Sequence, residues 1–425
     1  MANIIDYLLR RGFIEDTTGE DLLKESSKPL NVYSGFDPTS DSLHLGNMVA
    51  MMGLAWFQKF GHTPYVLIGG ATGMIGDPSG RSSERQLLDK ETLERNIAGI
   101  RKNLENFLDF SNPETKPVIV NNLDWFQDFS LVDFLRDVGK HFRLGPMLGK
   151  ESVRARMVSE EGLSFTEFSY QLLQGYDFLH LHDQYNVSLQ MGGSDQWGNI
   201  TAGIDLVRKT REKSVHGLTF PLLTRSDGQK FGKSEKGAIW LSPEKLSPYE
   251  FYQYLIRVAD ADVIKLMRML TFMEIEEIAE YEISMSRPDY IPNTSQKKLA
   301  DEVTLLVHGK AGVEIAHQVT EGIAPGSTSK LDSTMLEALA PQMPNYSLAR
   351  SEIEGVKFVD IIVKVGAMES KGDVKRLIRN GGVYLNNVKL QDENFLVTAD
   401  HLIDGNIDLI ALGKKNKLLI RATKF

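Results

Sequence analysis

Residues 31–60 read NVYSGFDPTSDSLHLGNMVAMMGLAWFQKF, and this stretch decides the fold. The run Asn31–Ser34 is strand-like, a polar Gly-Phe-Asp-Pro turn follows it, and Met48–Phe60 has the apolar spacing of a helix. A strand, a turn and a helix in this order begin a strand–helix–strand unit, whose ligands bind beyond the end of the strand. The signature HLGN, His44–Asn47, opens the helix, where backbone N–H groups attract phosphate.

The alternation of strands and helices continues through the first half of the chain. Short apolar strands are predicted at Thr63–Ile68, Pro117–Asn121, Val187–Met191 and Leu218–Leu223. Helices are predicted between them at Lys90–Phe110, Leu131–Val138, Thr166–Leu181 and Ser194–Arg211. This order predicts an α/β fold with a parallel sheet and crossover helices, a Rossmann-like nucleotide-binding catalytic domain. The segment from about 110 to 189 is long for one crossover, so we expect an inserted subdomain there.

The second half is predicted to be helical first and to end in a small α+β unit. Apolar residues recur at helical spacing from Ser247 to about Val319, and a linker-like run follows at Ala324–Ser329. Near the end, Gly372–Asn380 reads as a basic helix and Gly382–Leu390 as a hairpin that turns at two asparagines. The predicted domains are therefore catalytic (1–224, insertion about 110–189), a loop (225–246), α-helical (247–323), a linker (324–350) and a C-terminal domain (351–425).

Composition is that of a globular protein with more than one domain. The chain has 425 residues, of which 42% are hydrophobic and 25% charged. It has no cysteine, no apolar run long enough to cross a bilayer and no signal-peptide pattern at its start. We therefore expect a cytoplasmic protein without membrane contact. The net charge of −9 argues against broad affinity for nucleic acid, whereas a slight excess of Lys and Arg after residue 351 fits a local contact with polyphosphate.

A second signature, KFGKS at Lys230–Ser234, lies in a polar loop after the last predicted strand. Two ammonium groups on a flexible loop can reach a pyrophosphate as negative charge moves onto it. In HLGN, Gly46 leaves room for a nucleotide base against the backbone, and His44 can donate to phosphate oxygens. Each signature alone also fits an ordinary helix start or a solvated surface turn. Their joint occurrence predicts a nucleotide site.

Two further polar clusters are candidates for the same site. The run GGSDQWGN, Gly192–Asn199, follows a predicted strand; Asp195 suits a ribose hydroxyl and Gln196 a carboxylate or carbonyl, although a capped helix start also explains part of it. A second cluster, Tyr170, Gln174 and Asp177, lies on one face of a helix. Because this helix is otherwise rich in Phe and Leu, we expect the stripe to face a pocket rather than solvent. Asp77 follows another strand and is expected near it.

These pieces resemble the class I aminoacyl-tRNA synthetases, whose two signatures are written HIGH and KMSKS, and in particular the bacterial tyrosyl-tRNA synthetases. The resemblance extends along essentially the whole chain and rests on YSGFDPTSDSLHLGN, GGATGMIGDPSGR, SFTEFSYQLLQGYDF, GGSDQWGN, KFGKS and GDVKRLIRNGGVYLNN, the last similar to an S-four-like RNA-binding module. It implies a ligase that activates L-tyrosine with ATP to tyrosyl-adenylate and pyrophosphate and then transfers tyrosine to the 3′ end of tRNA(Tyr). Mg²⁺ would accompany ATP, and neither a protein-bound metal nor an organic cofactor is expected.

The same resemblance implies roles for individual residues. Tyrosine would be bound by Tyr33, Asp77, Tyr170, Gln174, Asp177 and Gln196, with Tyr33 and Asp177 on the phenolic hydroxyl. ATP would be bound by Ser34, Gly35, Asp37, Thr39, Gly46, Gly193, Asp195 and Lys233. Charge stabilisation during catalysis would come from His44, Asn47, Arg81, Arg85, Lys230, Lys233 and Ser234. Candidates for the acceptor stem are Lys150, Arg154, Arg208 and Lys209. Relatives form homodimers on which tRNA spans both subunits, and the helical domain would bind the anticodon.

Two alternatives are weighed against this reading. Tryptophanyl-tRNA synthetases share the fold, but they lack the C-terminal module, and an indole has no need of both Tyr33 and Asp177. A synthetase-derived RNA-binding protein without activity is expected to have lost residues such as His44, Asp195 or Lys233, all of which are present. Three residues depart from the commonest pattern, and each keeps a polar group: Asn47 for histidine, Ser34 for cysteine and Ser234 for threonine.

Overall fold

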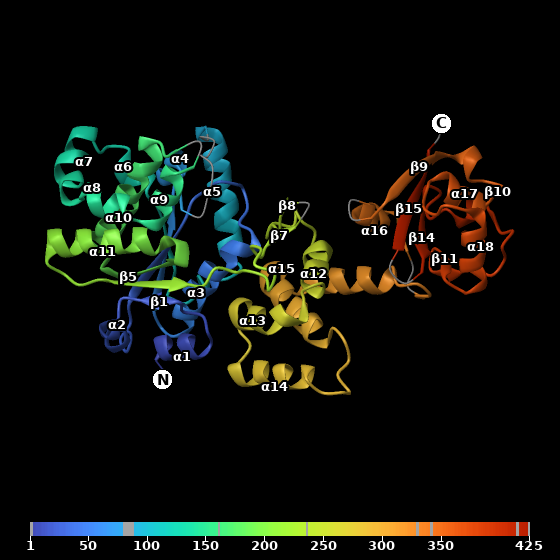
Figure 1. The fold of residues 1–425 in the computed structure, drawn as a ribbon, viewed down its shortest axis with the longest axis horizontal. Coiled ribbons are helices and arrows are strands. Elements are labelled where there is room, and N and C mark those ends of the chain that lie inside the picture. The colour runs from blue at the N-terminus through green and yellow to red at the C-terminus, as the bar shows by residue number, and fades with distance from the viewer. Residues whose placement is uncertain are drawn as a thin grey trace. The chain divides into compact units, whose positions relative to one another are not determined.

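The computed structural model describes residues 3–79, 89–159, 162–234, 237–328, 331–340, 343–413 and 416–423 (Figure 1). The chain forms two compact units. The first comprises Met1–Leu246 and Gln253–Gly309, and the second comprises Ser247–Tyr252 and Lys310–Phe425. Arg81 and Arg85 lie outside the described residues, and for Lys233 and Ser234 only the backbone is described.

A six-stranded sheet with the order β1-β6-β5-β2-β3-β4 forms the centre of the first unit. Its strands are β1 (Asp16–Thr17), β2 (Asn31–Phe36), β3 (Thr63–Ile68), β4 (Val118–Asn121), β5 (Val187–Gly193) and β6 (His216–Phe220). Neighbours pair in parallel, except that the short β1 is antiparallel to β6. The direction of the strand order reverses between β2 and β5, and open sheets of this kind bind ligands at such a point. The predicted parallel sheet is confirmed.

The helices of this unit are α1 (Ile4–Arg10), α2 (Glu20–Glu25), α3 (Met48–Lys59), α4 (Thr72–Ile75), α5 (Lys90–Leu104), α6 (Leu123–Phe126), α7 (Leu131–Asp137), α8 (Leu144–Leu148), α9 (Glu151–Met157), α10 (Phe165–Tyr185) and α11 (Trp197–Arg211). Five of them were predicted (α3, α5, α7, α10 and α11), although α5 ends at Leu104 and not at Phe110, and the other helices were not predicted. Of the segment expected as an insertion, β4 joins the main sheet and α10 packs on β5. The part outside the sheet is therefore the group α6–α9, which lies together at one end of the unit (Figure 1).

Helix α10 carries the predicted polar stripe. Ser164 caps its start by accepting a hydrogen bond from the backbone N–H of Glu167 (3.2 Å), and Asn186 ends it in the left-handed conformation with φ 52°. Phe178 and Leu181 of this helix are fully buried. Asp177 is buried as well, so the stripe faces the interior and not solvent, as predicted.

The stretch predicted to be helical contains α12 (Pro248–Ile256), α13 (Asp260–Leu270), α14 (Ile275–Met285) and α15 (Thr294–Gly322). Within α15, Gly309 has φ 68° and ψ −176°, which interrupts the helix. The two compact units divide at this glycine, so the helical stretch contributes to both of them. No helix in the described part of the chain has the length and apolar character needed to cross a membrane.

The second unit is built on a five-stranded sheet with the order β12-β11-β14-β15-β9. Its elements are α16 (Ser333–Leu339), β9 (Asn345–Ala349), β10 (Val356–Lys357), α17 (Phe358–Lys364), α18 (Lys371–Arg379), β11 (Val383–Leu385), β12 (Val388–Lys389), β13 (Leu396–Val397), β14 (Ile407–Leu412) and β15 (Asn416–Thr423). The predicted hairpin is confirmed, because β11 and β12 are joined by Asn386 and Asn387 at φ 49° and 67°.

The predicted linker at 324–350 differs from the structure. It contains α16 and β9, and β9 pairs in parallel with the last strand, β15. The C-terminal fold therefore begins before residue 351. A five-residue strand whose partner lies at the far end of the sequence leaves little local signal, which is why composition suggested a linker.

Candidate active site

A cavity of about 970 Å³ lies at the carboxyl ends of β2, β3 and β5, at the reversal of strand order. It is lined by predicted residues from every motif of the first unit: Tyr33, Ser34, Gly35, Asp37, Thr39, His44, Gly46, Asn47, Asp77, Tyr170, Gln174, Asp177, Gly193, Asp195, Gln196 and Lys230. All residues predicted for tyrosine, ATP or catalysis whose side chains are described are thus brought together. The sheet explains this, because parallel strands end at one edge.

Asp177 and Tyr33 are two of the most deeply buried residues that line the cavity. The Asp177 side chain is only 1% exposed, and its two oxygens accept hydrogen bonds from Trp125 Nε1 (3.0 Å) and Asn122 Nδ2 (3.1 Å). Burial raises the pKa of Asp177 to about 7. Burial first, and the nearby Asp177 second, raise the pKa of Tyr33 well above its usual value. A neutral hydroxyl and a buried carboxyl therefore lie close together here.

Three buried side-chain oxygens that line the cavity have no hydrogen-bond partner in the described structure: Tyr33 Oη, Gln174 Oε1 and Gln190 Oε1. Buried polar atoms are nearly always paired, so a group of unpaired ones around a cavity indicates a polar ligand. Sequence reasoning missed Gln190. The available signal was a glutamine in the predicted strand Val187–Met191, two residues before the start of the Gly192–Asn199 run.

A chain of hydrogen bonds connects Asp177 with Asp37. Asn122 Nδ2 also donates to Thr72 Oγ1 (3.0 Å), and Thr72 Oγ1 donates to one oxygen of Asp37 (2.8 Å). The other Asp37 oxygen accepts from Tyr170 Oη (2.9 Å). Thr72, Asn122 and Trp125 were not predicted. Asn122 directly follows a predicted strand, so the rule that selected Asp77, a polar residue after the end of a strand, could have selected it as well. The chain of hydrogen bonds therefore links the carboxyl groups of Asp177 and Asp37 through Asn122 and Thr72.

The GGSDQWGN run contacts Asp77, which also lines the cavity. Gln196 Nε2 donates to Asp77 Oδ2 (2.7 Å), and the backbone N–H of Ser79 donates to Asp77 Oδ1 (3.0 Å). Burial and the charge of Asp77 raise the pKa of Asp195, an effect that Lys230 partly offsets. At Gly193 a Cβ atom would lie 2.8 Å from Asp195 Oδ1, so a side chain at residue 193 would displace the Asp195 carboxyl group.

The HLGN signature is both a helix cap and a part of the cavity wall. The backbone N–H of Gly46 donates to His44 Nδ1 (3.1 Å), and Asn47 Oδ1 accepts from the backbone N–H of His44 (3.1 Å). Because Nδ1 accepts, the proton of the neutral His44 ring is on Nε2. A Cβ atom at residue 46 would lie 2.9 Å from His44 Cε1. Glycine at residue 46 therefore leaves room for the His44 ring to fold back. This is a second reason for glycine there, besides the predicted approach of a nucleotide base.

The two signatures lie directly against each other. A Cβ atom at Gly232 would lie 3.0 Å from the backbone nitrogen of Gly46. The chain after KFGKS then pairs with HLGN, since the N–H of Leu45 donates to Ile239 O (2.8 Å) and the N–H of Leu241 donates to Leu43 O (2.9 Å). Lys230 and His44 both line the cavity. Hydrogen bonds between backbone groups therefore hold the two signatures close together.

Comparison with known proteins identifies the family. Residues 24–323 match tRNA synthetases class I (W and Y), and residues 335–420 match the tyrosine--tRNA ligase SYY-like C-terminal domain. The chain belongs to the tyrosine–tRNA ligases. It is 59% identical over 421 residues to the tyrosine--tRNA ligase of Protochlamydia amoebophila, covering 99% of both chains. It is 50% identical to the chloroplastic/mitochondrial enzyme of Arabidopsis thaliana, covering 99% of this chain and 83% of that one.

The comparison with solved structures agrees with this family. A C-terminally truncated mitochondrial tyrosyl-tRNA synthetase of Aspergillus nidulans matches this ligase with a TM-score of 0.65 and 32% identity, over 74% of this chain and 92% of that one. A tryptophanyl-tRNA synthetase of Encephalitozoon cuniculi matches with a TM-score of 0.52 at 15% identity, which shows a shared fold alone. The tryptophan alternative is therefore less supported. This ligase is a class I enzyme that activates L-tyrosine with ATP and charges tRNA(Tyr), as the sequence resemblance implied.

Proposed function

We propose that tyrosyl-adenylate forms in the 970 Å³ cavity, with the tyrosine side chain against Tyr33 and Asp177. The observation that carries this assignment is the unpaired, fully buried hydroxyl of Tyr33 beside the buried carboxyl of Asp177. A phenol both donates and accepts one hydrogen bond, so its proton suits Asp177 and its oxygen suits Tyr33. Sites built to bind a hydroxyl reject the analogue without it by about 10⁴–10⁵-fold, a range established on tyrosyl-tRNA synthetases themselves.

The α-ammonium group of tyrosine is assigned to the acidic middle of the cavity. Asp77 is 7% exposed, and the unpaired Gln174 Oε1 is a further acceptor there. Tyr170 is already held by Asp37, which orients its oxygen toward the same space. We place Gln196 near the carboxylate of tyrosine because its amide lies on Asp77. An ammonium group held by carboxylates and neutral acceptors makes the charge-assisted hydrogen bonds that are strongest in a buried site.

ATP is assigned to the end of the cavity formed by the two signatures. The proposed contacts of its base and ribose are Ser34, Gly35, Thr39, Gly46, Gly193 and Asp195, with Asp37 at the border to tyrosine. His44 and Lys230 would stabilise charge on the phosphates, together with Asn47, Arg81, Arg85, Lys233 and Ser234. Attack of the tyrosine carboxylate on the α-phosphorus needs no side-chain nucleophile, only positioning and charge stabilisation. We also propose Mg²⁺ as counter-ion of ATP, since Mg²⁺ binds chiefly through substrate phosphates.

The tRNA is assigned to both units. Of the acceptor-stem candidates, Lys150 is distinctive, because its ammonium has no hydrogen-bond partner in the described structure and burial lowers its pKa to about 8. Arg208 and Lys209 are already paired with Asp205. The helical domain is proposed to bind the anticodon, and the C-terminal domain, with the basic α18, to bind tRNA as well. A cytoplasmic location is proposed with these partners.

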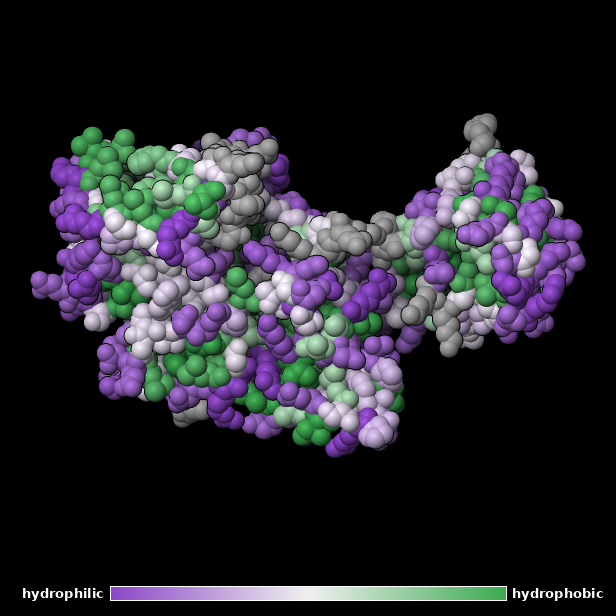
Figure 2. Space-filling view, in the orientation of Figure 1, coloured by the Kyte–Doolittle hydropathy of each residue, from purple (hydrophilic) through white to green (hydrophobic). Residues whose placement is uncertain are grey.

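We further propose a homodimer. Large apolar side chains are exposed on α7, α8, the end of α9 and the start of α10: Leu131, Val132, Leu135, Leu144, Leu148, Met157, Val158 and Phe165. Figure 2 shows apolar surface gathered where Figure 1 labels α6, α7 and α8. Exposed apolar surface of this extent is rare on monomers. A second copy of the chain is the proposed occupant of this surface, which we call the α7–α10 surface.

Exchange of pyrophosphate into ATP tests the assignment of the cavity. Exchange should depend on tyrosine and be nearly absent with phenylalanine or tryptophan at equal concentration. Charging of tRNA(Tyr), measured in parallel, tests the second step. Exchange with tryptophan at the tyrosine rate would contradict the assignment of Tyr33 and Asp177, because an indole N–H cannot satisfy both groups.

A further inference from the structure

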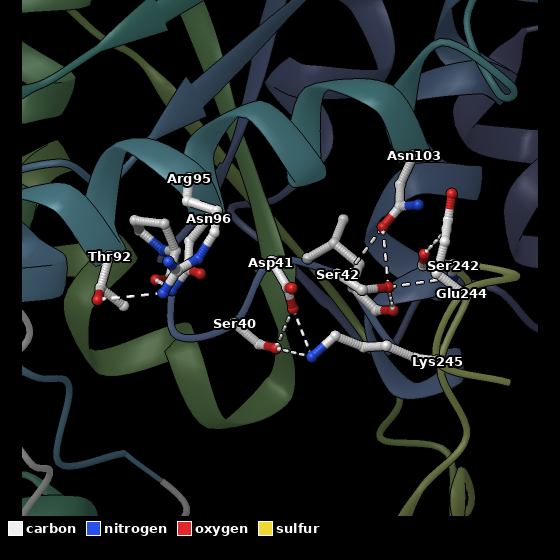
Figure 3. Close-up of polar contacts among 12 residues, drawn as sticks. Ser40, Asp41, Ser42, Thr92, Arg95, Asn96, Asn103, Ser242, Glu244 and Lys245 are labelled. Atoms are coloured by element: carbon white, nitrogen blue, oxygen red, sulfur yellow. Dashed lines mark hydrogen bonds and ion pairs between the residues drawn. The ribbon is translucent and has the colours of Figure 1, made fainter.

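Helix α5 holds the HLGN signature through one buried amide. Asn103, near the end of α5, is 5% exposed. Its Oδ1 accepts hydrogen bonds from the backbone N–H of Leu43 (2.8 Å) and from Ser42 Oγ (3.2 Å), as Figure 3 shows. Leu43 is the residue directly before His44. The amide of Asn103 therefore fixes the backbone from which the His44 side chain projects.

The same contact continues to the segment after KFGKS. Ser42 Oγ, held by Asn103, accepts a hydrogen bond from the backbone N–H of Ser242 (3.0 Å) (Figure 3). This segment is in turn joined to the second signature, because the N–H of Ile239 donates to the carbonyl of Gly232 (2.9 Å). One side chain of α5 is thus hydrogen-bonded directly to the residue before HLGN and, through Ser42, to the segment after KFGKS.

Helix α5 approaches the loop before HLGN closely along its length. A Cβ atom at Gly99 would lie 1.8 Å from the carbonyl oxygen of Asp41, so only glycine allows this approach. Asn96 Nδ2 donates to the carbonyl of Pro38 (2.8 Å). Lys102 pairs with Glu244 at 3.0 Å, on the segment that carries Ser242. The loop is therefore held at several points, of which Asn103 is the buried one next to His44.

We propose that Asn103 is a positioning residue, which holds His44 and the loop of Lys230 in register for the transition state of tyrosine activation. This inference rests on the proposed assignment of His44 and Lys230 to ATP. Neither contact of Asn103 involves the tyrosine end of the cavity, so its loss should leave tyrosine binding unchanged. Groups that act by electrostatic stabilisation must be placed accurately, and a shift of about 1 Å can cost about 10²-fold in rate.

The test compares Asn103→Ala with Asn103→Asp. Alanine removes the acceptor, whereas aspartate keeps an acceptor oxygen at the same place. In Asn103→Ala, the rate of tyrosyl-adenylate formation at saturating substrates should fall by roughly 10–100-fold. The KM for tyrosine should stay within about twofold, and Asn103→Asp should recover most of the rate.

A matched control is Gln58→Ala. Gln58 is another buried amide, 9% exposed, that anchors the loop after α5 through Asp109 and Thr115. Its loss should lower the melting temperature as Asn103→Ala does, without slowing adenylate formation. The positioning role is wrong if Asn103→Ala is no slower than Gln58→Ala, if the KM for tyrosine rises as far as the rate falls, or if Asn103→Asp is as slow as Asn103→Ala.

A His44→Ala variant separates this inference from the assignment of the site. An unchanged rate in His44→Ala contradicts the assignment of His44 to ATP and, with it, the positioning role. A slow His44→Ala beside a fully active Asn103→Ala contradicts the positioning role alone.

Discussion

Among single residues, Asp177 has the clearest consequence for pH. Burial raises its folded-state pKa to about 7, whereas in the unfolded chain a carboxyl titrates near its usual value of about 4. The folded protein therefore binds this proton more tightly, and the contribution of Asp177 to stability falls as pH rises from about 4 to about 7. Below about pH 4 the buried carboxyl is protonated in both states and costs no stability by ionising. Above about pH 7 it is ionised in both states, and the loss of stability no longer changes with pH.

In Asp177→Asn the side chain cannot ionise, so this variant should not share the parent's loss of stability at high pH. Its melting temperature relative to the parent should therefore rise by several degrees between pH 5 and pH 8, because each unit of pKa shift corresponds to about 1.4 kcal/mol. Asparagine has one acceptor oxygen where the carboxylate has two, so a hydrogen bond from Trp125 or Asn122 is also lost. The relevant measurement is therefore how the difference in melting temperature changes with pH, and not its value at one pH. In binding titrations the variant should lose affinity for tyrosine and keep its affinity for ATP. If the melting temperatures of the variant and the parent changed equally with pH, or if affinity fell equally for tyrosine and ATP, Asp177 would be an ordinary core residue.

At the residue scale, the sequence motifs selected residues that the structure brings together. The family motifs contain Tyr33, Asp77 and Gln196, and all of these line one cavity. Asn122, Trp125 and Thr72 were missed because their role is to hold Asp177 and Asp37, far away in the sequence. Such partners are defined only once the sheet brings β3, β4 and α10 together.

Among the elements, α1 and α13 are joined by a buried arginine. Arg11 is 0% exposed and donates to the backbone carbonyls of Arg268 (2.6 Å), Thr271 (2.5 Å) and Met273 (2.6 Å), at and after the end of α13. Its guanidinium also lies 4.8 Å from the ring centre of Trp56 in α3, the helix that HLGN opens. The last carbonyls of a helix lack partners and carry partial negative charge, so a cation with several donors stabilises them.

Arg11→Met is expected to destabilise the chain by at least about 3 kcal/mol, because several buried carbonyls lose their donor. Arg11→Lys should fall between methionine and the parent, since an ammonium keeps the charge without the planar fork. Arg10→Met is the control, because Arg10 has a side chain that is 64% exposed and makes only a surface pair with Glu276. Urea unfolding measures all three. Equal stability of Arg10→Met and Arg11→Met would contradict the role of Arg11.

Prediction of elements from sequence depended on the length of the apolar runs. The strand at Thr63–Ile68 is predicted with its observed bounds, because six apolar or β-branched residues lie between turns. The two-residue β1 and the strand β9 were not predicted. Both are defined by pairing with a strand distant in sequence, β6 and β15 respectively, and not by a pattern of their own.

At the scale of the whole molecule, the α7–α10 surface is firmly held. Arg156 of α9 and Glu167 of α10 form an ion pair at 2.8 Å in which both side chains are 2% exposed. This pair fixes α9 against the first turns of α10. Phe165, at the start of α10, is 78% exposed, whereas Tyr170, Gln174 and Asp177 of the same helix line the cavity. One helix, α10, therefore connects the proposed dimer surface with the proposed tyrosine site.

Phe165→Asp should convert the proposed dimer to a monomer, because a carboxylate buried between two copies has no partner and opposes its symmetry mate. Sedimentation at micromolar concentration gives the mass of each variant. Ile283→Asp is the matched control, since Ile283 is a 58% exposed apolar residue of α14 outside the α7–α10 surface, and this variant should stay dimeric. Because α10 reaches the cavity, the monomer should also bind tyrosine more weakly. A parent chain that sediments as a monomer would refute the dimer, and its exposed apolar surface would then need another occupant.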